Sequence, residues 1–149
     1  EHDCVDNYGK SKSLGENSTI TNIRTSIIGE EKINKKSLLE WVILNKGRVI
    51  DGYENHLWNG VTCLELTKII DQIIKNNKYW EGVRHIFSPD TVSKYELISM
   101  INDIYDLNVT INKKTTDADC YRNLKTLFIP MVKKSLYDQI LELKKFKLC

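Results

Sequence analysis

Long apolar runs, metal-ligand motifs and a strong charge imbalance are all missing from this sequence of 149 residues. No apolar stretch approaches the roughly 20 residues that a membrane-spanning helix needs, and the first residues do not resemble a secretory signal. The formal net charge of +2 indicates neither a nucleic-acid nor a membrane partner. We therefore predict a cytoplasmic protein with no nucleic-acid and no membrane partner.

The sequence also lacks paired cysteines. Its four cysteines are scattered, with no Cys-x-x-Cys and no histidine at ligand spacing: Cys4, Cys63, Cys120 and Cys149. A zinc site is therefore not expected, and neither is any other metal site. A disulfide or a reactive thiol is an alternative to incidental free thiols, which a reducing compartment favours.

A glycine-rich dinucleotide-binding turn is absent as well, since neither G-x-G-x-x-G nor G-x-x-G-x-x-G occurs. What is present is ordinary globular composition, with 41% hydrophobic and 28% charged residues. This length suits a single domain with room for a hydrophobic core.

The most informative stretch lies near the start, where residues 7–16 read as one short helix. Tyr8 and Lys12 stand four positions apart, so both side chains project from one helical face. A nearby cation favours a phenolate, and such a tyrosine can exchange a proton near neutral pH. Spacing alone equally fits a solvated helix face, because the same pattern recurs at Tyr121 and Lys125.

Helical and strand patterns alternate along the rest of the chain. The alternation predicts an α/β protein with a largely parallel sheet. We expect strands at 20–28, 48–50, 82–87 and 109–111, loops at 51–60 and 113–119, and helices at 35–45, from 62, from 93 to 105 and from 135. The strand at 20–28 should be buried because it is rich in β-branched residues.

Helix starts and apolar stripes add detail to this prediction. Asn34 should cap the helix at 35–45, and Thr62-x-x-Glu65 and Ser93-x-x-Glu96 are capping boxes. The inward-facing stripes are Leu38, Leu39, Val42 and Ile43; Leu66, Ile69, Ile70, Ile73 and Ile74; and Leu97, Ile98, Ile101 and Ile104.

The residues around the Tyr8 helix resemble a known family, the extended short-chain dehydrogenase/reductases. The closest branch is that of the dTDP-4-dehydrorhamnose reductase-like sugar-nucleotide reductases. The resemblance rests on the segment Y-G-K-S-K at 8–12, Glu16, the strand I-R-T-S-I-I-G at 23–29, S-P-D at 88–90 and S-K-Y-E-L at 93–97. The resemblance covers most of the chain. The second pair, Tyr121 and Lys125, is not followed by residues that resemble the family.

The resemblance implies a C-terminal half, because the family's glycine-rich turn and the hydroxyl partner of its tyrosine lie upstream of this helix. Residues 1–34 would then hold the catalytic helix and next strand of a Rossmann-like domain. Residues 35–149 would form mostly the smaller α/β substrate-binding region. Such a fragment is expected to be inactive by itself. The resemblance is compatible with a naturally short protein and with an artificial truncation.

The resemblance also implies an activity in deoxysugar and polysaccharide biosynthesis. NADPH or NADH would reduce the C4 ketone of a nucleotide-linked 4-keto-6-deoxy sugar, with Tyr8 as proton donor and Lys12 holding the cofactor ribose. Ser26 would lie near the nicotinamide, and Arg122 would face the substrate diphosphate, although an exposed arginine has no need of a ligand. Most of the cofactor contacts would belong to the upstream half.

Three aromatic residues of the expected loop at 51–60 are candidates for the sugar-nucleotide pocket: Tyr53, His56 and Trp58. A loop packed by its own aromatic rings is the equal alternative, and His56 has no identified catalytic or metal partner.

Two other functions stay open. A nucleotide-sugar epimerase or dehydratase would use the same Tyr8 and Lys12, and a non-catalytic binding or regulatory module would keep the fold alone. A half-sheet exposes a strand edge and an apolar face, so we expect a homo-oligomer or association with the other half.

Overall fold

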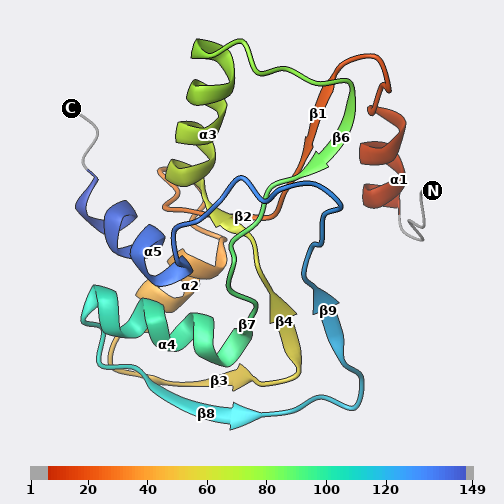
Figure 1. Ribbon diagram of the computed structural model, residues 1–149. Coiled ribbons are helices and arrows are strands. Elements are labelled where there is room, and N and C mark those ends of the chain that lie inside the picture. The colour runs from red at the N-terminus through yellow and green to blue at the C-terminus, as the bar shows by residue number, and fades with distance from the viewer. Residues whose placement is uncertain (1–6, 147–149) are drawn as a thin grey trace.

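The computed structural model describes residues 7–146 as alternating helices and short strands (Figure 1). The helices are α1 (Asn7–Leu14), α2 (Leu38–Leu44), α3 (Cys63–Lys75), α4 (Lys94–Tyr105) and α5 (Leu136–Lys145). The strands are β1 (Thr21–Arg24), β2 (Ile27–Ile28), β3 (Val49–Tyr53), β4 (His56–Trp58), β5 (Val61–Thr62), β6 (Gly82–His85), β7 (Val92–Ser93), β8 (Thr110–Lys114) and β9 (Cys120–Arg122).

Most strand pairings in the described chain are parallel. β1 pairs with β6, β2 with β5, β3 with β8 and β4 with β9 in parallel, and β7 joins β4 antiparallel. The predicted α/β class with parallel strands is therefore confirmed, although the strands form four small sheets in place of one. The pairing of β1 with β6 crosses position 34, and the predicted division at that point stays a prediction.

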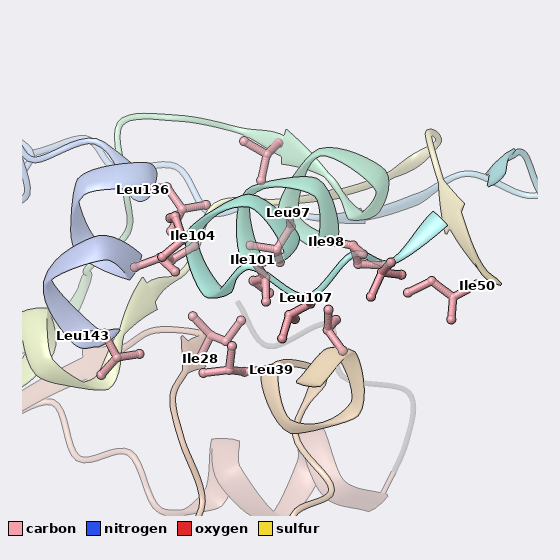
Figure 2. Packing of buried hydrophobic residues seen from close by; sticks show 14 residues of the cluster. Ile28, Leu39, Ile50, Leu97, Ile98, Ile101, Ile104, Leu107, Leu136 and Leu143 are labelled. Carbon is pink, nitrogen blue, oxygen red and sulfur yellow. The ribbon is translucent and has the colours of Figure 1, made fainter. Parts of the chain in front are cut away.

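The main core surrounds α4. Its predicted inward stripe is confirmed, since Leu97, Ile98, Ile101 and Ile104 are all buried. Figure 2 shows Ile101 and Ile104 between α5, which contributes Leu136 and Leu143, and the region of Leu39 and Ile28. This core fixes the position of Leu97, which also lines a cavity described below.

A smaller core lies between α3 and the β1–β6 pair. Val61, Ile69, Ile73 and Ile86 are buried there, and Ile23 of β1 packs against them. Figure 1 shows α3 and α1 on either side of β1 and β6. Ile70 and Ile74 were also predicted to face inward, but they are 37% and 58% exposed, because only the Ile69 and Ile73 side of α3 packs against this core.

Of the three predicted helix caps, one is confirmed in full, one in part and one is wrong. Ser93 and Glu96 form the complete capping box of α4. Helix α2 is capped by Ser37 and not by the predicted Asn34, and Ser135 caps α5. At α3 the Thr62 hydroxyl accepts from the Glu65 amide, but the Thr62 amide donates to Oε1 of Gln139. The buried Gln139 thus replaces half of the predicted box and ties α5 to α3.

One predicted strand and two predicted loops are wrong in detail. The predicted buried strand at 20–28 is two half-buried strands, because β1 pairs with β6 and β2 pairs with β5, with a break at 25–26. The predicted loop at 51–60 is mostly strand, with only a turn at 54–55 between β3 and β4. The predicted loop at 113–119 begins within β8, and the strand β9 was not predicted.

The start of α2 also differs from the prediction. The helix begins at Leu38 and not at Lys35, because Asn34 and Lys35 have positive φ values of 69° and 46°. Left-handed backbone cannot belong to a right-handed helix. The buried pair Leu39 and Val42 is nevertheless as predicted.

Candidate active site

Helix α1 places Tyr8 and Lys12 side by side, as their spacing predicts. The Lys12 Nζ lies 5.6 Å from the centroid of the Tyr8 ring, within the range of a cation–π contact. The Tyr8 side chain is 72% exposed, so its hydroxyl is open to a ligand.

An ion pair ties the end of α1 to the sheet. No residue of this eight-residue helix is buried, and isolated helices of this length are marginal in water. Just beyond it, Glu16 accepts hydrogen bonds from Nε and Nη2 of Arg24 on β1, at 2.5 and 2.6 Å. A two-point pair of this kind fixes direction as well as distance.

Replacing Arg24 with methionine is therefore expected to loosen α1 selectively. Amide hydrogen exchange in 8–14 should become about tenfold faster, since a loss of roughly 1.4 kcal/mol in local stability corresponds to that factor. Lys75→Met removes the exposed Lys75–Asp71 pair on α3 and is the matched control. Equal exchange in α1 in both variants would contradict the anchoring role of Arg24.

Four of the predicted site residues line one cavity of about 690 Å³, here called the Tyr8 cavity. They are Tyr8, Lys12, Ser26 and Arg122. The cavity lies where α1, β1, the break between β1 and β2 and the end of β9 meet, and the small residues Ser11 and Gly15 also line it.

Ser26 and Trp58 are joined directly. The indole Nε1 of Trp58 donates to the Ser26 Oγ at 2.7 Å, and the Ser26 carbonyl accepts from the Val61 amide at 2.9 Å. Gly60 is packed against both residues, so that an added Cβ would lie 2.1 Å from the Ser26 carbonyl oxygen. The interruption of the predicted strand is therefore fixed by two hydrogen bonds, one to the side chain of Ser26 and one to its carbonyl.

A second cavity of about 470 Å³ adjoins the first and is here called the Trp58 cavity. Ser26 and Arg122 line both cavities, and Trp58 and Arg122 are register partners on β4 and β9. Apolar residues including Ile28, Leu38 and Leu97 form much of its wall, and its potentially cationic groups are His56, Lys94 and Arg122. Both volumes are typical of small-molecule sites.

The remaining candidates have different positions. His56 lines the Trp58 cavity, with Nε2 2.9 Å from the Thr116 hydroxyl, whereas Tyr53 stacks on its ring at 4.9 Å and lines neither cavity. Tyr121 lies on β9, so its helical spacing to Lys125 places no pair on a helix face. Its hydroxyl donates to Asp119, which raises the pKa of Tyr121.

Two residues of the site were missed by the sequence analysis. Lys94 was assigned to a capping box and Arg24 to a strand, and although both lie in segments that resemble the family, neither was given a role in the site. No local signal marks either one, because Lys94 reaches the Trp58 cavity through the packing of α4, and Arg24 meets Glu16 through the turn after α1.

The described residues contain no group of three His, Cys, Asp or Glu side chains placed to hold a metal. Cys63 and Cys120 are free thiols, whereas Cys4 and Cys149 lie outside the described residues. Within the described part of the chain, no helix combines the length and apolar character needed to cross a bilayer.

The Tyr8 cavity fits the reactive end of a nicotinamide cofactor. The Lys12 ammonium and the Ser26 hydroxyl can donate to ribose or amide oxygens, and Gly15 leaves room beside them. The Ser11 hydroxyl donates to the Tyr8 carbonyl at 2.8 Å, so it can only accept from a ligand. The sequence has no glycine-rich turn for a pyrophosphate, so the fit concerns this end of the cofactor alone.

Solved structures that are similar to this chain share its Rossmann-like α/β fold, and the likeness concerns the fold alone. No protein-family model and no curated protein matches the sequence. The dTDP-4-dehydrorhamnose reductase of Bacillus anthracis, solved in complex with NADP, matches at 15% identity and a TM-score of 0.67 over 83% of this chain and 46% of its own. That of Clostridium acetobutylicum matches at 12% identity and a TM-score of 0.65, over 83% and 47%.

A related enzyme with another reaction also matches. The UDP-N-acetylglucosamine 4-epimerase of Methanobrevibacter ruminantium M1, in complex with UDP-N-acetylmuramic acid, has 13% identity and a TM-score of 0.57 over 83% of this chain and 44% of its own. The chain thus spans about half the length of the reductases it matches. Its fold resembles the C-terminal half of a dTDP-4-dehydrorhamnose reductase, which confirms the predicted resemblance.

Proposed function

We propose that this chain carries the proton-donating and substrate-binding part of an NADPH- or NADH-dependent reductase of nucleotide-linked 4-keto-6-deoxy sugars. The observation that supports this most is the shared wall. The cavity holding Tyr8 and Lys12 meets a second cavity at Ser26 and Arg122. One elongated ligand can therefore reach from the tyrosine into the Trp58 cavity.

Tyr8 is the proton donor in this proposal. Its exposed hydroxyl gives a proton to the alkoxide that forms at C4 of the sugar. Lys12, beside the ring, stabilises the phenolate that remains and donates to ribose hydroxyls. When bound, the nicotinamide supplies the hydride.

The two cavities divide the substrate between them. The sugar lies in the Tyr8 cavity, and the Arg122 guanidinium binds the phosphate at the junction, where its planar donors suit phosphate oxygens. The nucleoside extends along Trp58 and the apolar wall of the Trp58 cavity. Ser26, which accepts a hydrogen bond from Trp58, lies at the boundary between the sugar and the nucleoside portions of the substrate.

A nucleotide-sugar epimerase is the second candidate, favoured by the likeness to the 4-epimerase. The same tyrosine and lysine would serve it, with the nicotinamide returned to its starting redox state after each turnover. Net oxidation of the cofactor separates the two reactions.

The test has two steps. NADPH and NADH are titrated calorimetrically into this chain, and the full-length gene product is then assayed with dTDP-4-keto-6-deoxy sugar by loss of reduced-nicotinamide absorbance. We expect turnover in the second step. Conversion of a sugar nucleotide without net cofactor loss would instead identify an epimerase, and nucleotide-sugar binding without either reaction would leave a non-catalytic module.

A further inference from the structure

Lys94 and Arg122 line the same cavity, and neither is neutralised there by a described carboxylate. Other cations of the described chain are paired, such as Lys113 with Glu54 and Lys114 with Asp51. Neither Lys94 nor Arg122 has a carboxylate within ion-pair distance among residues 7–146, and no Asp or Glu lines the Trp58 cavity that they share. Two positive groups therefore face one cavity without a described counter-charge.

Two aromatic rings hold Lys94 in place. Its Nζ lies 5.9 Å from the centroid of Trp41 and 5.6 Å from that of Tyr53, both within cation–π range. Lys94 is also the first residue of α4, directly after the cap Ser93. The nearby Glu96 carboxylate accepts from the Ser93 amide at 2.6 Å and does not line the cavity. The half-buried ammonium is thus restrained on two sides.

The positions of the two cations determine the direction in which a ligand lies. Arg122 lies on the wall shared with the Tyr8 cavity, whereas Lys94 lines the Trp58 cavity alone. A sugar nucleotide with its ketone at Tyr8 brings the sugar-linked phosphate to Arg122 first. The nucleoside-linked phosphate then lies farther into the Trp58 cavity, on the side of Lys94.

We propose that Lys94 binds the nucleoside-linked phosphate of a nucleoside diphosphate-sugar, next to the sugar-linked phosphate that the proposed function gives to Arg122. This inference deepens the proposed function and rests on it for the identity and direction of the ligand. Lys94 then determines specificity for a phosphorylated nucleoside, and Arg122 for the second phosphate. A compact ammonium and a planar guanidinium each suit a single phosphate group.

The test compares nucleotides that differ by one phosphate. We titrate two series into the chain and record amide chemical shifts: thymidine, dTMP and dTDP, and uridine, UMP and UDP. Lys94→Met should lower the affinity for the mono- and diphosphates about tenfold and leave the affinity for the nucleosides unchanged. Arg122→Met should lower the affinity for the diphosphates alone by a similar factor.

Lys113→Met is the matched control, because Lys113 also lies over a tyrosine ring, at 4.7 Å from the centroid of Tyr95, but outside the Trp58 cavity. It should change no affinity. Equal weakening of nucleosides and nucleotides by Lys94→Met would show a structural role and overturn the proposal, as would unchanged affinities or no saturable binding of dTDP and UDP. A failed reductase assay leaves this nucleotide pattern intact, so the two proposals fail separately.

Discussion

Replacing Tyr8 with phenylalanine is expected to lower kcat for the proposed sugar reduction about a thousandfold in the full-length gene product, since a positioned acid contributes roughly 10² to 10⁴. The affinity for NADPH or NADH should hardly change, because only the hydroxyl is removed. Single-turnover absorbance gives the rate, and calorimetry gives the Kd.

The variant is expected to fold normally. The Tyr8 hydroxyl makes no hydrogen bond with any described residue, and the ring is largely exposed. Tyr121→Phe is the matched control, because Tyr121 is 66% exposed and stands four positions before a lysine as Tyr8 does. Turnover within threefold of wild type in Tyr8→Phe would remove Tyr8 from the mechanism.

The largest loss of stability is expected from Ile101→Ala. Ile101 is fully buried at the centre of the α4 stripe, between α5 and the Leu39 region. Truncation of a buried isoleucine to alanine costs about 2 to 5 kcal/mol, through lost burial and the cavity left behind. Since domains of this size have a free energy of unfolding of about 5 to 15 kcal/mol, a large share of the stability would disappear.

Ile74→Ala on α3 makes the same chemical change at a side chain that is 58% exposed. Its cost should stay within about 1 kcal/mol. Urea unfolding followed by circular dichroism measures both values. Losses of similar size in the two variants would contradict the packing around α4 described above.

The helices could be predicted because their signals are local. The stripe of α4 and its Ser93–Glu96 box are fixed by spacing within one segment, and both agree with the structure. The prediction failed where other segments intervened. Gln139, from the far end of the chain, takes the Thr62 amide that the second capping box was expected to satisfy.

The strands were harder because a strand depends on its partner. Residues 20–28 are rich in β-branched side chains, but β1 and β2 pair with different strands, and the strand is interrupted at 25–26. The polar composition of 51–60 and 113–119 indicated loops. It instead reflects short strands with half-exposed faces, where polar residues are as suitable as apolar ones.

The site was predictable to different degrees. The contact of Tyr8 with Lys12 follows from helical spacing alone. Ser26 and Arg122 were candidates through the resemblance, and Trp58 was one as an aromatic residue of an expected loop. Their arrangement around two adjoining cavities depends on the pairing of β4 with β9 and on the hydrogen bond between Trp58 and Ser26. The place of Lys94 in the cavity wall was not predicted, because the residue lies within a capping box and this gave sufficient reason for its position in the sequence.

The pairing pattern has a kinetic consequence. Thr21 pairs with Gly82, Val49 with Thr110 and His56 with Cys120, so the contact order of the chain is high. The entropy lost in closing such long loops comes before any stabilisation from the strand contacts. Proteins of this kind therefore fold in milliseconds to seconds, after their helices have formed. Helix α1 depends on the pair of Glu16 with Arg24 of β1 for its position, and its tyrosine faces no complete ligand site until β9 has docked. Nucleotide binding should therefore be the last property to return on refolding.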